Sequence, residues 1–400
     1  MKIEFKYYII IISLVFFGCS TDNDSEETSN INNVNILNPQ DPSETQNNIP
    51  ERFISLTGEA SVIGVKQDGT LWAWGKNVSG EMGNGQTSSY TNNFLPYHIG
   101  TDTNWKTVEY SGSSVIGLKT DGTIWRWGTV VNLQNHQNVL IPFPSQIGTD
   151  NDWKKVVGTS AYYIGIKENG SLWGWGFYNY IGLGYTPNPY LTPIMLNNGI
   201  WKDIAKGVNH SILLKNDGTL WALGNNNFGA LGNGTETFSN YILTQIGNST
   251  DWKSISTGEY SNFAIKENGT LWAWGRNLFG VLGLGDNVDR YSVTQVGTDS
   301  DWKKVYTCGK NTIFLKNNGK IYGCGSLMTK YIGISINSVT ETYSPVQLNN
   351  NTDWENVYCT DNAFFANKIN LDTWGIGYSY SLGINTSNFF NLAMTPVAWN

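Results

Sequence analysis

The chain has 400 residues, of which 14% are charged and 14% aromatic, and its formal net charge at pH 7 is −7. An acidic surface repels phosphate backbones, so this charge disfavours a protein that wraps nucleic acid. The length would ordinarily suggest more than one domain, but the internal repetition described below replaces that expectation.

The first 18 residues have the pattern of an export signal. A basic segment precedes an apolar run of eleven residues from Tyr7 to Phe17, and the small residue Gly18 follows it. A helix of this length rises about 16 Å, which is too short for a hydrocarbon core of about 30 Å. We therefore predict a signal peptide over residues 1–18 and not a membrane-spanning helix.

The end of this apolar run resembles a bacterial lipobox. Its residues are Leu14-Val15-Phe16-Phe17-Gly18-Cys19. The resemblance implies that Cys19 becomes the first residue of the mature chain and carries a lipid, which would be the only contact with the membrane. An ordinary signal peptide that happens to contain a cysteine is the alternative. We expect a lipid-anchored protein of the cell envelope, at the outer membrane or the surface of a Gram-negative bacterium.

Residues 19–52 are predicted to be the lipidated cysteine and a flexible polar tether. Asn, Ser, Thr, Asp and Glu dominate this segment, and almost no aromatic residue occurs in it. Such a composition cannot bury enough apolar area to offset the entropy lost on ordering. The acidic start, Ser20 to Glu27, loosely resembles the stretch after the lipidated cysteine in surface-exposed lipoproteins of some Gram-negative groups. A merely solvated tether explains the same composition.

Residues 53–400 repeat a unit about fifty residues long. A W-x-W-G motif, or a decayed form of it, ends in glycines that lie 48 to 53 residues apart. These glycines are Gly75, Gly128, Gly176, Gly224, Gly275, Gly325 and Gly375. A period near fifty is typical of propellers and repeat arrays.

Each unit divides into four short segments that we predict to be strands. The first starts with Trp, as in Trp153–Gly158, or with Phe53 in the first unit. The second ends in an Asp-Gly or Asn-Gly pair such as Asn268-Gly269, which predicts a two-residue type I′ hairpin turn. The third contains the W-x-W-G motif, and the fourth follows a polar loop.

Seven such units predict an all-β, seven-bladed β-propeller of four-stranded repeats. One small sheet cannot cover both of its apolar faces, whereas seven sheets around an axis cover one another. An open solenoid would need polar capping repeats, but the last unit ends in an ordinary fourth strand, Thr395–Trp399. We also expect the first and last units to lie in the same blade or in neighbouring blades.

Tryptophans recur at equivalent places in the units. They are Trp72, Trp74, Trp105, Trp125, Trp127, Trp153, Trp173, Trp175, Trp201, Trp221, Trp252, Trp272, Trp274, Trp302 and Trp354. A ligand site usually needs residues unique to one place, so we predict that most of these rings are buried between adjacent sheets. The Asp that precedes many of them is likewise interpreted as a structural turn or cap.

The units resemble the regulator-of-chromosome-condensation repeat. That pattern is a G-x-x-H-S/T segment, an apolar strand, D-G, a strand ending in W-G, and then N-x-x-G-x-L-G-x-G. Residues 207–234 carry all of it, and the tail recurs at 276–285 and 76–85. The second unit has 129–140 in place of the tail, the sixth has only Tyr331-Ile332-Gly333, and the seventh has Lys368-Ile369 in place of D-G. We expect these units to keep their strands and to differ in their loops.

This resemblance implies a seven-bladed propeller and leaves the function open. The eukaryotic namesake of the family is a nuclear guanine-nucleotide exchange factor that also binds histones, and an exported acidic chain is not expected to meet such partners. Secreted bacterial propellers of similar repeat type include inhibitors that bind an enzyme through the mouth of the ring.

No catalytic, metal-binding or cofactor motif is recognised, so we expect no enzyme, no metal and no cofactor. Candidate acids without a motif are Glu81, Asp286 and Glu341, and the scattered histidines are His98, His136 and His210. The cysteines Cys308, Cys324 and Cys359 show no C-x-x-C spacing, and we interpret them as small buried hydrophobes. One pair could instead be bridged in an exported protein.

We therefore expect a non-enzymatic binding module whose partner is a protein or a glycan and not a nucleic acid. The aromatic loops 177–180 and 185–190 are candidate contact surfaces, although their rings could equally pack between blades. A hydrolase or lyase acting on polysaccharide, and a purely structural surface protein, are the alternatives.

Overall fold

The computed structural model describes residues 52–396 of the chain apart from 59–60, 136, 160–161, 178–180, 184–188, 237–238, 327–340, 361–362, 370–372, 379–381 and 383–389. The predicted lipid attachment residue, Cys19, therefore lies outside the described residues. Within them, no helix is long and apolar enough to cross a membrane.

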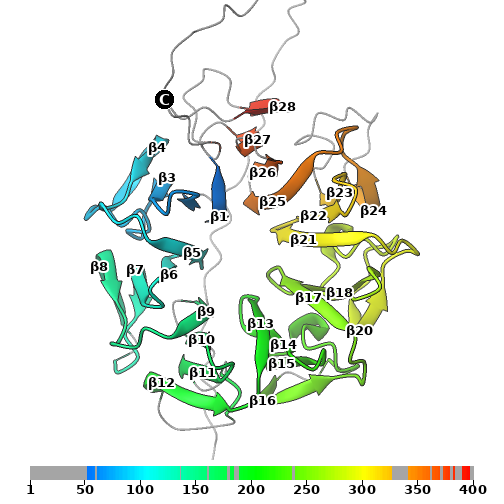
Figure 1. Ribbon diagram of the computed structural model, residues 1–400, viewed down its shortest axis with the longest axis horizontal. Helices are drawn as coiled ribbons and strands as arrows, with labels where there is room; N and C mark the ends of the chain where they lie inside the picture. The colour runs from blue at the N-terminus through cyan, green and yellow to red at the C-terminus, as the bar shows by residue number, and fades with distance from the viewer. Residues whose placement is uncertain are drawn as a thin grey trace, which may run out of the picture. The chain divides into compact units, whose positions relative to one another are not determined.

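The chain forms seven four-stranded antiparallel sheets, each built from strands that follow one another along the sequence. Figure 1 shows these sheets as blades around a central axis, with the first strand of each blade innermost. The predicted all-β, seven-bladed propeller is confirmed.

Blade 1 contains β1 (Phe53–Gly58), β2 (Ser61–Lys66), β3 (Leu71–Asn77) and β4 (Ser88–His98). Blade 2 contains β5 (Trp105–Tyr110), β6 (Ser114–Lys119), β7 (Ile124–Val131) and β8 (Asn138–Gln146). Blade 3 contains β9 (Trp153–Gly158), β10 (Tyr162–Lys167), β11 (Leu172–Gly176) and β12 (Tyr190–Asn197). Blade 4 contains β13 (Trp201–Lys206), β14 (His210–Lys215), β15 (Leu220–Asn225) and β16 (Ser239–Ile246).

The remaining three blades have the same order. Blade 5 contains β17 (Trp252–Thr257), β18 (Ser261–Lys266), β19 (Leu271–Gly275) and β20 (Arg290–Gln295). Blade 6 contains β21 (Trp302–Cys308), β22 (Asn311–Lys316), β23 (Ile321–Ser326) and β24 (Glu341–Gln347). Blade 7 contains β25 (Trp354–Thr360), β26 (Ala363–Lys368), β27 (Thr373–Tyr378) and β28 (Phe390–Pro396). Two short 3₁₀ turns, η2 (Asn227–Gly229) and η3 (Leu278–Gly280), lie in the glycine-rich tails of blades 4 and 5.

The turn between the second and third strands differs from the predicted type I′ turn. In blade 5, Gly269 has a φ of +80°, whereas Asn268 does not have a positive φ. The Gly269 N–H donates to the Lys266 carbonyl at 2.9 Å, and the Asn268 side chain accepts from the N–H and the hydroxyl of Thr270. This arrangement is a type I turn followed by a left-handed glycine. The Asn or Asp is favoured because its side-chain oxygen accepts these two bonds.

The repeated tryptophans pack in the ring as predicted. Ten of the fifteen are buried. The other five are half-buried, and each donates its indole N–H to a Thr or Ser hydroxyl two residues earlier. These five are Trp72, Trp125, Trp173, Trp221 and Trp272. Since none is exposed, the tryptophans do not form an aromatic binding surface.

The second Trp of the W-x-W-G motif connects neighbouring blades. Trp274 of β19 donates its indole N–H to the Ala230 carbonyl of blade 4 at 3.1 Å, and Trp127 donates to the Glu81 carbonyl of blade 1 at 2.7 Å. In blade 6 the same place is taken by Cys324, whose thiol donates to the Val281 carbonyl at 3.3 Å. The glycine-rich tail of one blade therefore supplies the acceptor for the next.

A lysine at the end of the second strand lies between two tryptophan rings. In blade 2, Lys119 Nζ is 4.8 Å from the centroid of the Trp105 ring and 3.9 Å from that of Trp125, and it pairs with Asp102 at 2.7 Å. Equivalent ion pairs join Lys167 to Asp150 and Asp152, Lys266 to Asp251, Lys316 to Asp299 and Asp301, and Lys368 to Asp353. The recurrent aspartates are thus structural, because they neutralise a cation held against the rings.

The ring closes between blades 1 and 7. The Phe53 carbonyl of β1 accepts hydrogen bonds from Asn367 Nδ2 at 2.7 Å and from Tyr358 Oη at 3.3 Å, and its N–H donates to Thr373 Oγ1 at 3.1 Å. Arg52 pairs with Glu355 at 2.6 Å. The last fourth strand, β28, stays in blade 7. The expectation that the first and last units lie in the same or neighbouring blades is confirmed, although Val397 itself lies outside the described residues.

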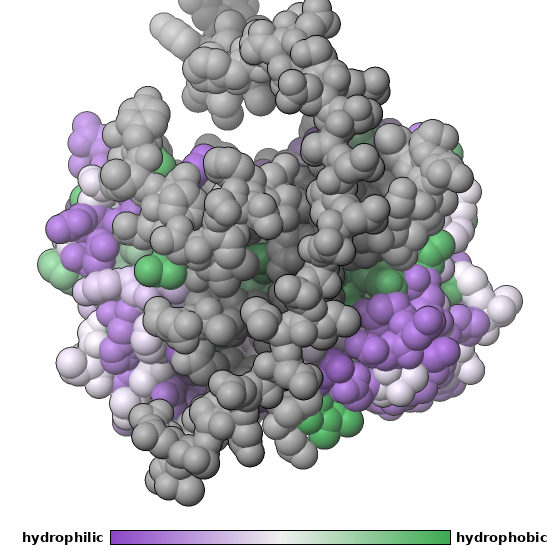
Figure 2. All heavy atoms as spheres, turned by 90° about the horizontal axis from the view of Figure 1, so that it is seen from above, coloured by the Kyte–Doolittle hydropathy of each residue, from purple (hydrophilic) through white to green (hydrophobic). Residues whose placement is uncertain are grey.

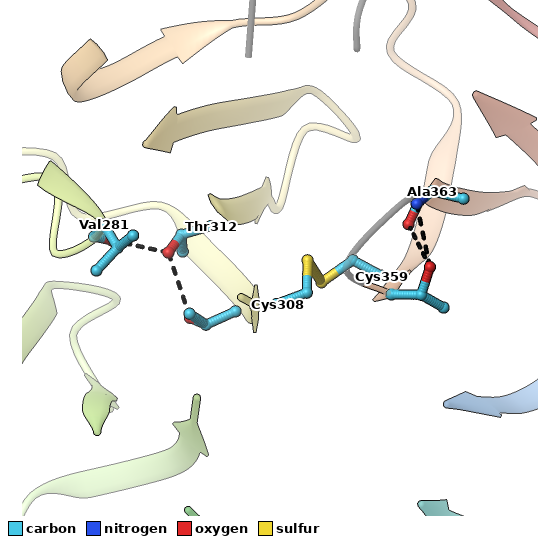
Figure 3. The surroundings of a disulfide bond; sticks show 7 residues. Val281, Cys308, Thr312, Cys359 and Ala363 are labelled. Carbon is cyan, nitrogen blue, oxygen red and sulfur yellow. Dashed lines mark hydrogen bonds between the residues drawn. A yellow bond between two sulfur atoms is a disulfide. The ribbon is translucent and has the colours of Figure 1, made fainter. Parts of the chain in front are cut away.

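Two of the three cysteines of the propeller are bridged, which corrects their interpretation as three buried hydrophobes. Cys308 of β21 and Cys359 of β25 form a disulfide with a Cα–Cα distance of 5.8 Å (Figure 3). Among the described cysteines, Cys324 is the free buried thiol. The bridge joins the innermost strands of blades 6 and 7, next to the point where the ring closes.

Of the three departing units, the second is described throughout its third and fourth strands. In place of a glycine-rich tail it extends β7 and β8 into a longer hairpin, in which Val131 pairs with Asn138. This unit keeps its strands and changes its loop, as predicted. The sixth-unit loop at 331–333 lies outside the described residues. Figure 2 shows a described surface that is largely hydrophilic with separate apolar patches.

Candidate binding site at the central channel

A channel runs through the centre of the propeller. Its volume is about 1140 Å³, and its walls come from the first strands of all seven blades. A cavity of this size exceeds the range of about 300–1000 Å³ that is common for small-molecule pockets.

A β-bulge recurs at the second residue of every first strand. In blade 3, Trp153 pairs with Lys167 and Lys155 pairs with Ile166, so that Lys154 is left out of the ladder. The same break occurs at the start of the first strand in each of the other blades. A bulge turns the extra side chain out of the sheet. These residues are Ile54, Lys106, Lys154, Lys202, Lys253, Lys303 and Glu355.

The bulged residues all lie at one end of the channel. Hydrogen bonds between neighbouring first strands connect residues at equivalent positions in the two strands. At the second position, Lys303 Nζ donates to the Glu355 carbonyl at 3.1 Å. Residues at the third position of neighbouring first strands are also in contact, since Lys304 Nζ donates to Asn356 Oδ1 at 2.6 Å. The first strands therefore run side by side in one direction.

Five of the seven bulged residues are lysines, and all five are exposed. We call them the lysine mouth; its members are Lys106, Lys154, Lys202, Lys253 and Lys303. Two further lysines at the third position, Lys155 and Lys304, face the channel just inside the mouth, and we call them the inner lysines. In a chain with a net charge of −7, this concentration of positive charge is local.

The inner lysines have few counter-charges. Lys155 pairs with Asp203, the one acidic side chain at this level of the described channel wall. Lys304 has only the neutral Asn356 as its hydrogen-bond acceptor and lies 4.8 Å from the centroid of the Tyr306 ring. Burial, together with the positive charges of Lys155 and Lys303, lowers the pKa of Lys304 to about 8. Strongly shifted groups in a cleft are typical of binding or catalytic sites.

The candidate acids do not form a catalytic pair. Glu81 accepts hydrogen bonds from Ser61 Oγ at 2.7 Å and from the Ser79 N–H within blade 1. Asp286 pairs with Arg290 at 2.6 Å, and hydrogen bonding to Arg290 lowers the pKa of Asp286. Glu341 accepts from Tyr343 Oη at 2.8 Å. None of the three is among the residues that line the channel.

The two described histidines are structural. His210 is fully buried with its Nε2 2.7 Å from Asn262 Oδ1, and burial lowers the pKa of His210 to about 4. His98 stacks on Trp72 with centroids 5.0 Å apart. His136 lies outside the described residues. In the described part of the chain, no three His, Cys, Asp or Glu side chains are grouped closely enough to hold a metal ion.

The predicted aromatic contact loops are largely beyond what the structure describes, because residues 178–180 and 184–188 are not described. The lysine mouth was not predicted from the sequence. Its signal was the dipeptide Trp-Lys, which opens the first segment in five of the seven units.

Comparison with known proteins supports the repeat assignment. Models of the regulator of chromosome condensation (RCC1) repeat match residues 201–230, 252–281 and 217–265, within blades 4 and 5. No curated protein sequence matches the chain.

Several solved structures share the fold. Yeast RCC1 (Prp20), solved bound to Kap60, has a TM-score of 0.67 at 17% identity and covers 92% of this chain and 91% of its own. Human WBSCR16 has a TM-score of 0.67 at 14% identity, covering 80% and 88%. Prp20p from Saccharomyces cerevisiae has a TM-score of 0.59 at 19% identity, covering 75% and 77%. At these identities the likeness shows the fold alone. The chain is therefore a seven-bladed β-propeller that contains regulator of chromosome condensation (RCC1) repeats.

Proposed function

We propose that this chain is a non-enzymatic protein-binding module of the cell envelope that engages its partner at the lysine mouth of the propeller. The observation that carries the proposal is the exposed ring of lysines around one end of a large channel. Propellers of this fold serve protein binding elsewhere: Prp20p is described by its binding to Gsp1p and histones, and yeast RCC1 was solved bound to Kap60.

The position in the envelope is supported by the cysteines. A disulfide persists in oxidising compartments and is rare in the cytosol, so the Cys308–Cys359 bridge favours an exported chain. The lipobox-like end of the leader, Leu14 to Cys19, favours a lipid anchor.

We expect Cys19→Ser to release the protein from membranes, because the lipid is the only anchor that the proposal includes. Fractionation of cells that express the full precursor measures this, with Cys324→Ser as a control that leaves the lipobox intact. Full retention of Cys19→Ser in the membrane fraction would show that the chain is not held by a lipid on this residue.

Affinity capture tests the binding function. The lipid-free chain, residues 19–400 with Cys19→Ser, is used as bait on an envelope extract of the producing organism, and a panel of glycans is incubated with the same preparation. The proposal expects a discrete protein that is retained by the folded bait and not by the heat-unfolded bait. Cleavage of a glycan without any protein partner would instead favour the polysaccharide hydrolase or lyase.

A further inference from the structure

We propose that the lysine mouth and the inner lysines bind one carboxylate-rich polypeptide segment of the partner, which enters the channel end-on. This inference rests on the proposed function and names the chemistry that the same site recognises.

The first observation is an imbalance of charge within the channel. At the mouth end its wall carries Lys106, Lys154, Lys202 and Lys303 together with both inner lysines. The nearby acids are fewer: Asp203 pairs with Lys155, Glu267 lies 3.9 Å from Lys202, Glu355 pairs with Arg52, and Glu109 lines the wall deeper inside. Lysines outside the site, such as Lys167 and Lys316, each pair with two aspartates. Like charges in a partly enclosed site repel one another and favour an anionic ligand.

The second observation is the position of Lys304 inside the mouth. Its ammonium group lies beside the Tyr306 and Tyr358 rings, 4.8 and 5.7 Å from their centroids, and its hydrogen-bond acceptor, Asn356, is neutral. Asp203 is the acid that acts on this half-buried cation, and it is already paired with Lys155. A further carboxylate placed beside Lys304 would reduce the cost of desolvating its charge. The ligand must therefore be thin enough to pass the mouth and reach this depth.

The third observation is the presence of three exposed carboxylates outside the mouth. The turns between second and third strands lie at the same end of the blades, as the bond from the Trp105 N–H to the Gly69 carbonyl at 3.0 Å shows. Asp68, Asp121 and Asp217 are exposed in these turns. They repel a membrane or an anionic polymer that lies flat across this face, whereas a segment along the channel axis avoids them.

A polypeptide segment fits this arrangement better than a small anion. The lysines of the mouth come from five different blades, so a single small anion cannot contact all of them. An extended chain rises about 3.3 Å per residue, and carboxylates on successive residues therefore reach the mouth and the inner lysines together.

The test uses a fluorescein-labelled peptide of alternating Glu and Gly, about ten residues and so about 33 Å long when extended. Its affinity for the lipid-free chain is measured by fluorescence anisotropy at low ionic strength. We expect Lys154→Glu/Lys303→Glu to weaken binding by about tenfold or more, because two attractions become repulsions. The matched control is Lys76→Glu/Lys310→Glu, which reverses two exposed lysines at the opposite end of the blades and should change the affinity less than about twofold.

Lys304→Met tests whether the peptide reaches the inner lysines, and we expect it to weaken binding of the peptide. Thermal unfolding of the same variant checks that it is folded. An equal loss of peptide affinity in the Lys76→Glu/Lys310→Glu control, or an unchanged affinity in Lys304→Met, would contradict entry of the peptide into the channel. Tighter binding of phosphatidylglycerol vesicles or of polygalacturonate than of the peptide would contradict the ligand class. In each of these cases, a partner retained in the capture experiment would still support the binding function, so the two proposals fail separately.

Discussion

Trp274→Ala is expected to lower the free energy of unfolding by about 3–5 kcal/mol, since it removes a large buried ring and leaves a cavity. The ring is fully buried, and its indole N–H donates to the Ala230 carbonyl of the preceding blade. The blades fit closely here, because a Cβ on Gly232 would lie 2.8 Å from Trp274 Cδ1. A loss of this size is a large share of a total stability of about 5–15 kcal/mol.

Chemical denaturation followed by Trp fluorescence and circular dichroism measures the effect. The control is Val288→Ala in the same blade, where the side chain is 58% exposed and should contribute little. Trp274→Phe should have an intermediate effect, because it keeps one aromatic ring but loses the hydrogen bond and part of the buried volume. The packing assignment would be wrong if Trp274→Ala and Val288→Ala had equal and negligible effects.

Most of the fold could be predicted from the sequence because the propeller repeats one local solution. The spacing of glycines from Gly75 to Gly375 determined the number of blades, and the copied tryptophans indicated a packing role. Phe53 was correctly placed as the equivalent of the Trp that opens the other units, and it is fully buried. The turn type was wrong because both turn types favour Asn-Gly and Asp-Gly. The two turn types differ in the backbone conformation of the residues before the turn glycine.

The candidate site was harder to predict because its residues are spread over the whole ring. A lysine after Trp is unremarkable in any one unit. It becomes a cluster only when the bulge turns Lys154 and Lys303 toward a shared channel mouth. Burial of Lys304 is likewise a property of the closed ring, since Tyr358 comes from the neighbouring blade. The ligand's chemistry could therefore not be read from the sequence of any single unit.

The disulfide was left open at the sequence level, although its signal was present. Cys308 and Cys359 are 51 residues apart, which is close to one repeat period. Residues one period apart take nearly the same place in neighbouring blades, and neighbouring first strands lie in contact. A cysteine pair at the repeat period on the first strands therefore predicts a bridge between blades.

Removal of this disulfide is expected to cost up to about 4 kcal/mol, the chain-entropy value for a loop of about fifty residues. The bridge joins β21 to β25 (Figure 3). Tyr358, beside Cys359, donates to the Phe53 carbonyl where the ring closes. Losing the bridge gives the unfolded chain more freedom and loosens the blade that must meet β1. We therefore expect the effect on stability to be accompanied by faster proteolysis at the junction of blades 1 and 7.

Unfolding of the wild-type chain with and without a reductant measures the effect, and Cys308→Ala/Cys359→Ala provides the matched variant. The reductant should lower the stability of the wild type to that of the double variant and should leave the double variant unchanged. Cys324 is a buried free thiol, so it cannot account for a change that the double variant abolishes. An unchanged wild type after complete reduction would mean that the non-covalent contacts between blades 1 and 7 hold the ring closed without the bridge. The ring would then not depend on an oxidising compartment.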